Sequence, residues 1–286
     1  MTDLAWARVA RDGVDRGGGV LLAPRLLLTA LHCVAGVEIG DSESRLQVSV
    51  ADRVPVQAVL EARAETADLA LLKLSHSLGS AVQLPVASRC RRGDKWFAPS
   101  RPSPTDPELA GDVVGPVVYD CQAGGRIDAV QLTSQAVLGN YQGYSGGPVF
   151  TAPEDQHNVI GVLIEQYPDR VDHARATNTL FAAAIEGAMD QFASLQTAYL
   201  LRRLYDYEDA RNEAAAKGDE KHRVTLDRVN AAEDVDDVDQ KHIATVLGWL
   251  GTAGAIDPEV RGLHQALVNK WVLEHGEGYD REEHAK

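Results

Sequence analysis

Short apolar runs separated by turn residues make up the chain from residue 4 to about residue 185. Runs that are rich in Val, Leu and Ala and bounded by Gly, Pro, Asp or Ser are typical of β-strands. Many short strands at close spacing predict a barrel or a sandwich. The stretch 99–112 holds four prolines and is predicted to be an exposed loop. The strand-like runs are LAWARVA, GGVLLAP, LLLTALH, LQVSVAD, VPVQAVLEARA, LALLKLS, DKWFAPS, DVVGPVVYD, IDAVQLTS, GGPVFTA and VIGVLIEQY.

The apolar spacing changes after about residue 185. Apolar residues now recur at steps of three or four, which places them on one face of a helix. We therefore expect an all-β domain over residues 1–186, followed by an all-α helical bundle over residues 187–286. The residues of the first helical face are Ile185, Met189, Phe192, Leu195, Tyr199 and Leu200, and further helices are predicted at about 221–232, 236–250 and 258–274.

Charge and composition exclude several classes of protein. The chain carries 28 basic and 42 acidic residues, which argues against non-specific nucleic-acid binding, since that binding depends on neutralising phosphates. Its longest apolar stretch is interrupted by Pro24, Arg25 and His32, which argues against a membrane span. The N-terminal residues lack the pattern of a secretory signal, so we expect a cytoplasmic protein.

The three cysteines, Cys33, Cys90 and Cys121, are widely spaced and none belongs to a CxxC pair. In a reducing compartment such residues are thiols, and their spacing does not support a zinc site. No metal or cofactor is implied by the sequence.

The candidate chemistry begins with the stretch GNYQGYSGGPVF at residues 139–150, which crowds glycines around Ser145. A surface turn is one interpretation, since Ser and Gly are common turn formers. The other is a nucleophile whose neighbouring N–H groups can hold an oxyanion. A hydroxyl nucleophile needs an imidazole as base, and the imidazole needs a buried acceptor. His32 follows one apolar strand and Asp68 precedes another, and each of them could equally be structural.

The three segments LTALHCV, DLALLKL and GYSGGPV resemble the three motifs of the trypsin-like (chymotrypsin-fold) serine peptidases, in the same order along the chain. The resemblance covers about residues 5–185. It implies two six-stranded barrels with the active site between them. It also implies that Ser145 is the nucleophile, His32 the general acid and base and Asp68 its orienting partner. The N–H groups of Gly143 and Ser145 would form the oxyanion hole.

The resemblance also gives the residues that would bind substrate. Gly139 would form the floor of the primary pocket, next to Asn140, and Gln166 would stand in its wall. An aspartate at the floor would have attracted Arg or Lys, so its absence removes the simplest case for cleavage after basic residues. Glu165, Asp169 or Asp172 could still bring an acid in from the side.

Two positions depart from the family. Tyr144 stands before the nucleophile, where the digestive-type members have an aspartate that pairs with a newly cut N-terminus. We therefore expect no activation by propeptide cleavage, with the oxyanion loop, from Gly139 to Ser145, either permanently formed or ordered by a partner. Cys33 stands where secreted members form a disulfide, and no cysteine lies upstream to meet it.

The sequence thus predicts a cytoplasmic serine endopeptidase that acts on a protein or peptide substrate through an acyl-enzyme. The alternative is a catalytically silent scaffold that binds peptides. The helical part either stabilises the barrels or binds a regulatory protein. In the latter case its architecture resembles bacterial signalling and defence proteins that fuse a trypsin-like domain to an effector-associated or death-like adaptor. A stress-type protease fits less well, because a mixed peptide-binding domain would be expected after its barrels.

Overall fold

The computed structural model describes residues 5–50, 53–77, 82–103, 105–122, 125–151, 158–168, 176–196, 198–199 and 202. The chain divides into two compact units, Met1–Ala210 and Arg211–Lys286. Every described residue belongs to the first unit. The helices predicted at about 221–232, 236–250 and 258–274 lie outside the described residues.

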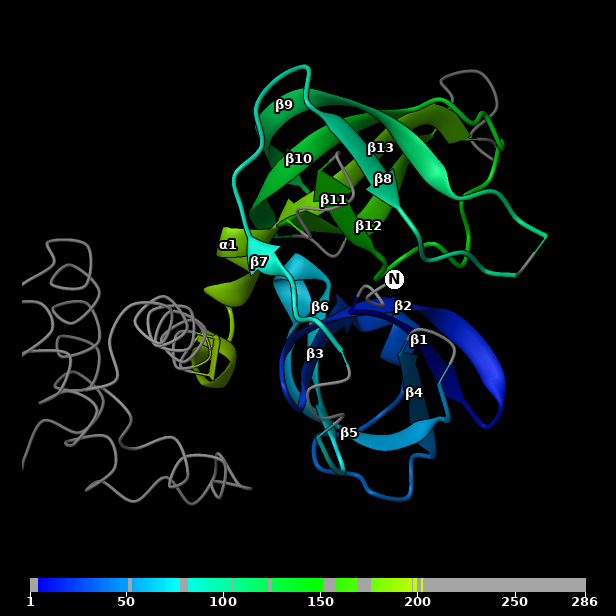
Figure 1. The fold of residues 1–286 in the computed structure, drawn as a ribbon, viewed down its shortest axis with the longest axis vertical. Coiled ribbons are helices and arrows are strands. Elements are labelled where there is room, and N and C mark those ends of the chain that lie inside the picture. The colour runs from blue at the N-terminus through cyan, green and yellow to red at the C-terminus, as the bar shows by residue number, and fades with distance from the viewer. Residues whose placement is uncertain are drawn as a thin grey trace, which may run out of the picture. The chain divides into compact units, whose positions relative to one another are not determined.

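The N-terminal half of this unit is a closed antiparallel barrel with the strand order β1-β2-β3-β6-β5-β4 (Figure 1). Two short 3₁₀ helices, η1 (Leu31–Val34) and η2 (Glu65–Ala67), follow β3 and β5. Both helices therefore stand at ends of barrel strands. The strands are β1 (Trp6–Arg11), β2 (Val14–Ala23), β3 (Leu26–Ala30), β4 (Leu46–Val50), β5 (Val56–Ala64) and β6 (Leu69–Leu74).

A second barrel follows, with the order β11-β8-β9-β10-β13-β12, and pairing of β11 with β12 closes it. The short β7 (Val86–Ala87) adds to β12 in parallel. The two six-stranded barrels implied by the sequence are thus confirmed. The other strands are β8 (Lys95–Ala98), β9 (Leu109–Asp120), β10 (Arg126–Ser134), β11 (Pro148–Thr151), β12 (Asn158–Pro168) and β13 (Ala176–Ala184), and α1 (Ile185–Met189) follows β13.

The loop predicted over residues 99–112 is shorter than expected. β9 begins at Leu109, which pairs with Ala98 of β8, and only residues 99–108 lie between the two strands. Ser100 is buried rather than exposed. The prolines marked a break in the chain correctly, but pairing with β8 decides where the next strand begins.

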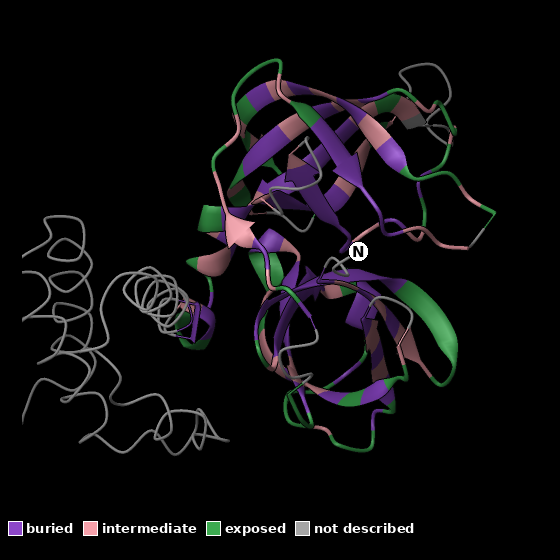
Figure 2. Cartoon of the chain, in the orientation of Figure 1, coloured by how far each residue is buried: buried purple, intermediate pink, exposed green. Residues whose placement is uncertain are grey.

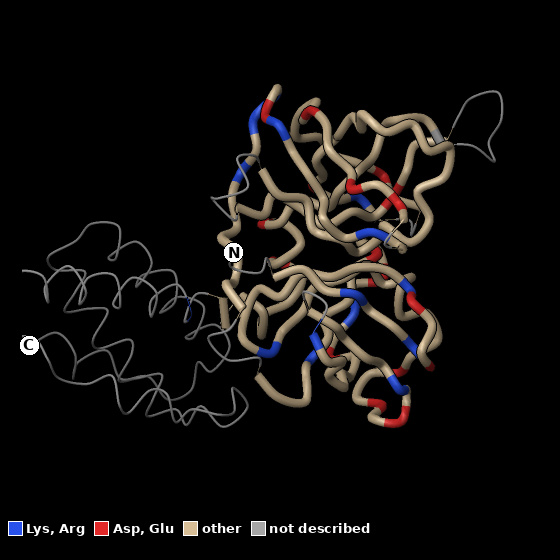
Figure 3. Tube along the Cα trace, turned by 45° about the vertical axis from the view of Figure 1, so that its right-hand side comes forward, with Lys and Arg blue, Asp and Glu red and all other residues tan. Residues whose placement is uncertain are grey.

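Strand alternation gives each barrel an interior and gives the two barrels a common interface. Leu21 of β2 points into the first barrel, whereas its neighbours Val20 and Leu22 join a cluster that includes Phe150 and Phe181 of the second barrel. Burial of side chains of this size stabilises the fold by about 1.5–3 kcal/mol each. Figure 2 shows the buried positions along the strands of both barrels, and Figure 3 shows basic and acidic positions interspersed over them.

The described residues that follow β13, up to Arg202, pack on the barrels. Ile185, Phe192 and Leu195 are buried in the cluster that joins the two barrels. The Tyr199 hydroxyl accepts a hydrogen bond from Ala87 N at 2.8 Å. The buried Arg202 guanidinium donates from Nη2 to the carbonyl of Pro85 at 2.8 Å. This segment therefore holds the connection between the barrels in place, and the boundary predicted at residue 186 stays a prediction.

Candidate active site

His32 and Asp68 are brought together by the pairing of β3 with β6. Ala30 at the end of β3 faces Leu69 at the start of β6, so the residues just beyond these two positions are neighbours. Leu31 N donates to the carbonyl of Asp68 at 2.8 Å. Asp68 adopts the left-handed conformation with φ 53°, which aspartate tolerates better than most residues. The turn thus directs its carboxylate back toward η1.

The Asp68 carboxylate is bound by two groups of His32. His32 Nδ1 lies 2.6 Å from Oδ2, and the His32 backbone N–H donates to Oδ1 at 3.0 Å. Because an ionised carboxylate only accepts, Nδ1 carries a proton and Nε2 is left for the substrate side. The Asp68 side chain is 13% exposed and the His32 side chain is 46% exposed, so the acceptor is sheltered and the imidazole is accessible.

This carboxylate also sets the charge of the imidazole. The hydrogen bond to Asp68 raises the pKa of His32 well above its ordinary value of 6.5, the neighbouring Cys33 raises it further, and burial opposes them. The cause is that a negative acceptor favours the imidazolium over the neutral ring. His32 is therefore suited to hold the proton that a hydroxyl nucleophile gives up.

Ser145 lies on a tight turn before β11, and hydrogen bonds from both barrels fix this turn. Gly146 N donates to the Leu163 carbonyl of β12 at 2.7 Å, and Gly18 N of β2 donates to the Ser145 carbonyl at 2.8 Å. Gly143 and Gly146 have φ of 89° and 78°, a conformation that glycine adopts without strain. The glycines that flank Ser145 in the sequence are thus explained by the turn.

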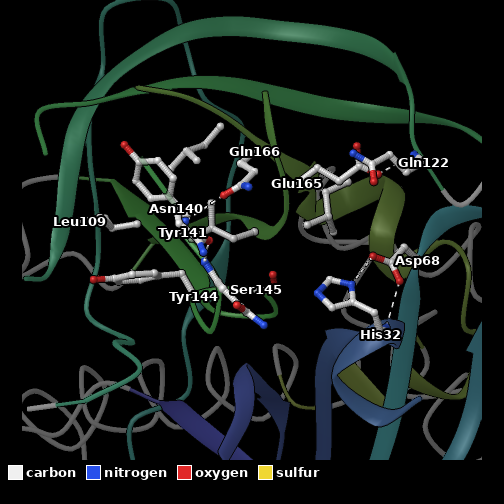
Figure 4. A pocket seen from close by; sticks show the side chains of 14 residues that line it. His32, Asp68, Leu109, Gln122, Asn140, Tyr141, Tyr144, Ser145, Glu165 and Gln166 are labelled. Atoms are coloured by element: carbon white, nitrogen blue, oxygen red, sulfur yellow. Dashed lines mark hydrogen bonds and ion pairs between the residues drawn. The ribbon is translucent and has the colours of Figure 1, made fainter. Parts of the chain in front are cut away.

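Ser145 lines the same cavity as His32 and Asp68, with a volume of about 660 Å³ (Figure 4). Within the described residues, no hydrogen bond joins the Ser145 hydroxyl to His32. Among the same residues, no backbone carbonyl accepts from the N–H groups of Gly143 and Ser145, as an oxyanion hole requires.

The close approach of β2 to the nucleophile turn leaves no room for a side chain at Gly18. A Cβ there would lie 2.5 Å from Ser100 Oγ and 2.7 Å from Gly147 Cα. We expect Gly18→Ala to lower kcat for chemistry at this site by about 100-fold, because displacements near 1 Å have effects of that size. Gly187→Ala is the matched control, since its Cβ would make an ordinary 3.4 Å contact. Equal activity of the two variants would contradict this prediction.

Two of the three residues expected to bind substrate reach the cavity. Asn140 and Gln166 line it, whereas Gly139 is not among the lining residues. Gln166 Oε1 accepts from Tyr141 N at 2.8 Å, so its amide is held across the pocket wall. Leu109 and Leu180 also line the cavity, and no sequence signal identified them, because strand pairing brings them there from distant parts of the chain.

Glu165 also lines the cavity, but its carboxylate points away from Asn140 and Gln166 (Figure 4). It accepts from the Tyr119 hydroxyl at 2.7 Å and from Gln122 N at 2.5 Å. Asp169 and Asp172, the other acids considered for this pocket, lie outside the described residues.

Tyr144 ties the oxyanion loop to the loop 99–108. Its ring is buried, and its hydroxyl donates to the Pro107 carbonyl at 2.8 Å. Pro102 of the same loop packs on Gly143, where an added Cβ would lie 2.8 Å from the proline Cγ. The sequence revealed that an aspartate was missing at this position but not what the tyrosine contacts.

The three cysteines are free thiols, as expected. Within the described ranges, no group of three or more His, Cys, Asp or Glu residues is arranged to hold a metal ion. No helix in the described part of the chain is long and apolar enough to cross a membrane.

The chain matches the family model described as trypsin-like peptidase domain over residues 17–162. No curated protein sequence matches it. Among solved structures, it is similar to the inactive form of the Rv3671c protease of M. tuberculosis, at 18% identity and a TM-score of 0.51, over 68% of this chain and 90% of that one. The active form of that protease gives 17% identity and a TM-score of 0.50, over 67% and 81% of the two chains. The HtrA-type protease AlgW with a decapeptide gives 20% identity and a TM-score of 0.50, over 65% and 53%.

Proposed function

Since the chain belongs to the trypsin-like peptidase domain family, we propose that it is a serine endopeptidase whose catalytic residues are Ser145, His32 and Asp68. The observation that carries this proposal is the 2.6 Å contact of His32 Nδ1 with Asp68 Oδ2 at a cavity that Ser145 also lines. Hydrolysis of a peptide bond needs a nucleophile, a base and an acceptor that orients the base, and these three side chains are of those types.

Acylation follows from the roles of these groups. Ser145 Oγ attacks the carbonyl carbon of the substrate while His32 Nε2 takes its proton, and Asp68 stabilises the imidazolium that forms. The N–H groups of Gly143 and Ser145 bind the developing oxyanion, a contribution of about 3 kcal/mol per donor in such sites. The C–N bond then breaks, His32 gives its proton to the leaving amine, and an ester remains on Ser145.

Hydrolysis of this ester repeats the sequence with water as the nucleophile. His32 Nε2 takes a proton from water, the hydroxide oxygen attacks the ester carbonyl, and the proton returns to Ser145 Oγ as the acid product leaves. No metal or cofactor takes part in the proposed steps.

We propose that the substrate has an uncharged residue on the carbonyl side of the bond that is cleaved. This residue is referred to as the cleaved residue. Asn140, Tyr141 and Gln166 line the cavity on the side away from His32 and Asp68 (Figure 4). Amide and apolar groups of this kind offer no charge to pair with a lysine, an arginine or an acid, and burying an unpaired charge is costly.

We propose that the oxyanion loop does not depend on a newly cut N-terminus. The hydrogen bond of Tyr144 to Pro107 and the packing of Gly143 on Pro102 support this, because they hold the loop through contacts within the second barrel. Full-length protein that is active as made, or active once a partner is added, would agree with this proposal. Dependence on N-terminal trimming would refute it.

The part of the chain after the barrels is proposed to be an adaptor that binds a regulatory partner in a cytoplasmic signalling or defence pathway. The three free thiols agree with a reducing compartment. Ending the chain after Ala210 tests the adaptor role, because this keeps Phe192, Leu195 and Tyr199 on the barrels. An active but unregulated protease would support the adaptor, whereas an insoluble one would favour a stabilising bundle.

Labelling with an active-site fluorophosphonate tests the catalytic proposal. We expect the full-length protein to be labelled at Ser145 and the Ser145→Ala variant not to be labelled, with hydrolysis of a peptide mixture lost in the same variant. A wild-type chain that binds peptides but takes no label, with or without lysate, would favour the catalytically silent scaffold.

A further inference from the structure

Glu165 places a second carboxylate in the cavity, close to His32 and Asp68 (Figure 4). Among the described residues, the groups that donate hydrogen bonds to it are the Tyr119 hydroxyl and Gln122 N, and both are neutral. No ion pair of Glu165 with a lysine or an arginine occurs among the residues that the structure describes. Because Asp68 is already bound to His32, Glu165 is the carboxylate of this cavity whose charge has no cationic partner in the described part of the chain.

The groups around Glu165 hold this carboxylate in a fixed position. The Tyr119 ring stacks on Phe181 with the ring centres 3.9 Å apart. The turn between β9 and β10 is closed by Cys121 N donating to the Gly125 carbonyl at 2.9 Å. It contacts the first barrel through Cys121 Sγ, 2.9 Å from the carbonyl of Thr66 in η2. The carboxylate is thus built into a wall that reaches the residues just before Asp68.

Consecutive residues of β12 serve different parts of the cavity. Gln166 bonds to Tyr141 on the side of Asn140, whereas Glu165 faces Tyr119 and Gln122 on the side of His32. An extended substrate also alternates its side chains. If the cleaved residue occupies the part beside Asn140 and Gln166, the residue that precedes it directs its side chain toward His32 and Glu165.

We propose that Glu165 selects a basic residue, lysine or arginine, immediately before the cleaved residue. The inference rests on the proposed function and adds to it the class of substrate. A partly buried carboxylate whose donors in the described part of the chain are neutral attracts a cation more strongly than a solvated surface acid does. The same charge disfavours an acidic residue at that position.

The test compares peptides that differ only in the residue before the cleaved one. For the full-length protein at low salt, we expect kcat/KM to be about tenfold higher with lysine there than with alanine, and lower still with glutamate. Glu165→Gln should reduce the ratio of lysine to alanine to near one. Glu165→Lys should reverse the order, so that the glutamate peptide becomes the best of the three. Glu38→Gln, at an exposed position of the first barrel, is the matched control and should keep the wild-type ratio.

Fluorophosphonate labelling of Ser145 in every variant separates this inference from the proposed function. If Glu165→Gln is labelled and its lysine-to-alanine ratio of kcat/KM equals that of the wild type, the role of Glu165 is overturned. The proposed peptidase activity would then still stand. A wild type that takes no label would overturn both. We expect the lysine-to-alanine ratio of kcat/KM of the wild type to fall toward one as the salt concentration rises, since salt screens an electrostatic preference.

Discussion

Replacement of Ser145 with alanine is expected to lower kcat for peptide hydrolysis by about 10⁶-fold, the order of loss found when the serine of such a triad is removed. The alanine variant has no nucleophile, so neither the ester nor its hydrolysis can occur. KM should change little, because Asn140, Gln166 and the other lining residues stay in place. Initial rates with a fluorogenic peptide, at protein concentrations high enough to detect the residual rate, measure this effect.

The double variant His32→Ala with Ser145→Ala tests whether the residues act as a unit. Groups that serve one step are strongly non-additive, so the double variant should be about as active as either single variant. Ser42→Ala, an exposed serine of the first barrel, is the control and should retain full activity. Losses that multiply in the double variant, or activity that survives Ser145→Ala, would contradict the proposed triad.

The sequence predicted many short strands, and it placed His32 and Asp68 at the ends of two of them, because both depend on local signals, whereas the two barrels were implied by the family resemblance. The pair stands just beyond two strands, β3 and β6, whose apolar runs are plain in the sequence. Once those strands pair, the two side chains must be neighbours. The glycines around Ser145 were equally informative, because positive φ at Gly143 and Gly146 limits which residues can stand there.

The sequence did not predict the wall around Glu165. Tyr119 and Gln122 come from the end of β9 and the turn after it, and Glu165 comes from β12, which is not a neighbour of β9 in the sheet order. Contacts of this kind arise from closure of the barrel and leave no periodic signal in the chain. Glu165 therefore looked like an acid for the primary pocket, although the structure directs it to the opposite side.

The helical face after residue 185 was predicted from its spacing, and its described members are largely buried. Ile185, Phe192, Leu195 and Tyr199 all belong to the cluster between the barrels. Apolar spacing identifies the face that is buried but not the surface that covers it. The bonds of Arg202 to the carbonyls of Leu22 and Pro85 show that here the covering surface is the barrels themselves.

Asp68→Asn is expected to lower kcat by about 10⁴-fold while the fold stays intact. An asparagine is close to aspartate in size, but its neutral amide neither fixes the Nδ1 proton of His32 nor stabilises the imidazolium. Loss of the carboxylate should also lower the pKa of His32 toward 6.5, because the hydrogen bond to Asp68 is the largest cause of its rise. The rate of the wild type should fall as the pH drops through the raised pKa, and this acid limb should move to lower pH in the variant. Profiles of kcat/KM against pH measure both effects.

Protein stability should respond to pH in the opposite sense to activity. A histidine with a raised pKa in the folded state stabilises the fold fully below its unfolded value of about 6.5, and this contribution is lost as the pH rises through the folded value. The wild type should therefore exceed Asp68→Asn in stability most clearly below about pH 6.5. The activity of the wild type, in contrast, should grow as the pH rises. Glu65→Gln, three residues away and exposed, is the control for both measurements. If the acid limb of Asp68→Asn coincided with that of the wild type, Asp68 would not be the group that sets the charge of His32.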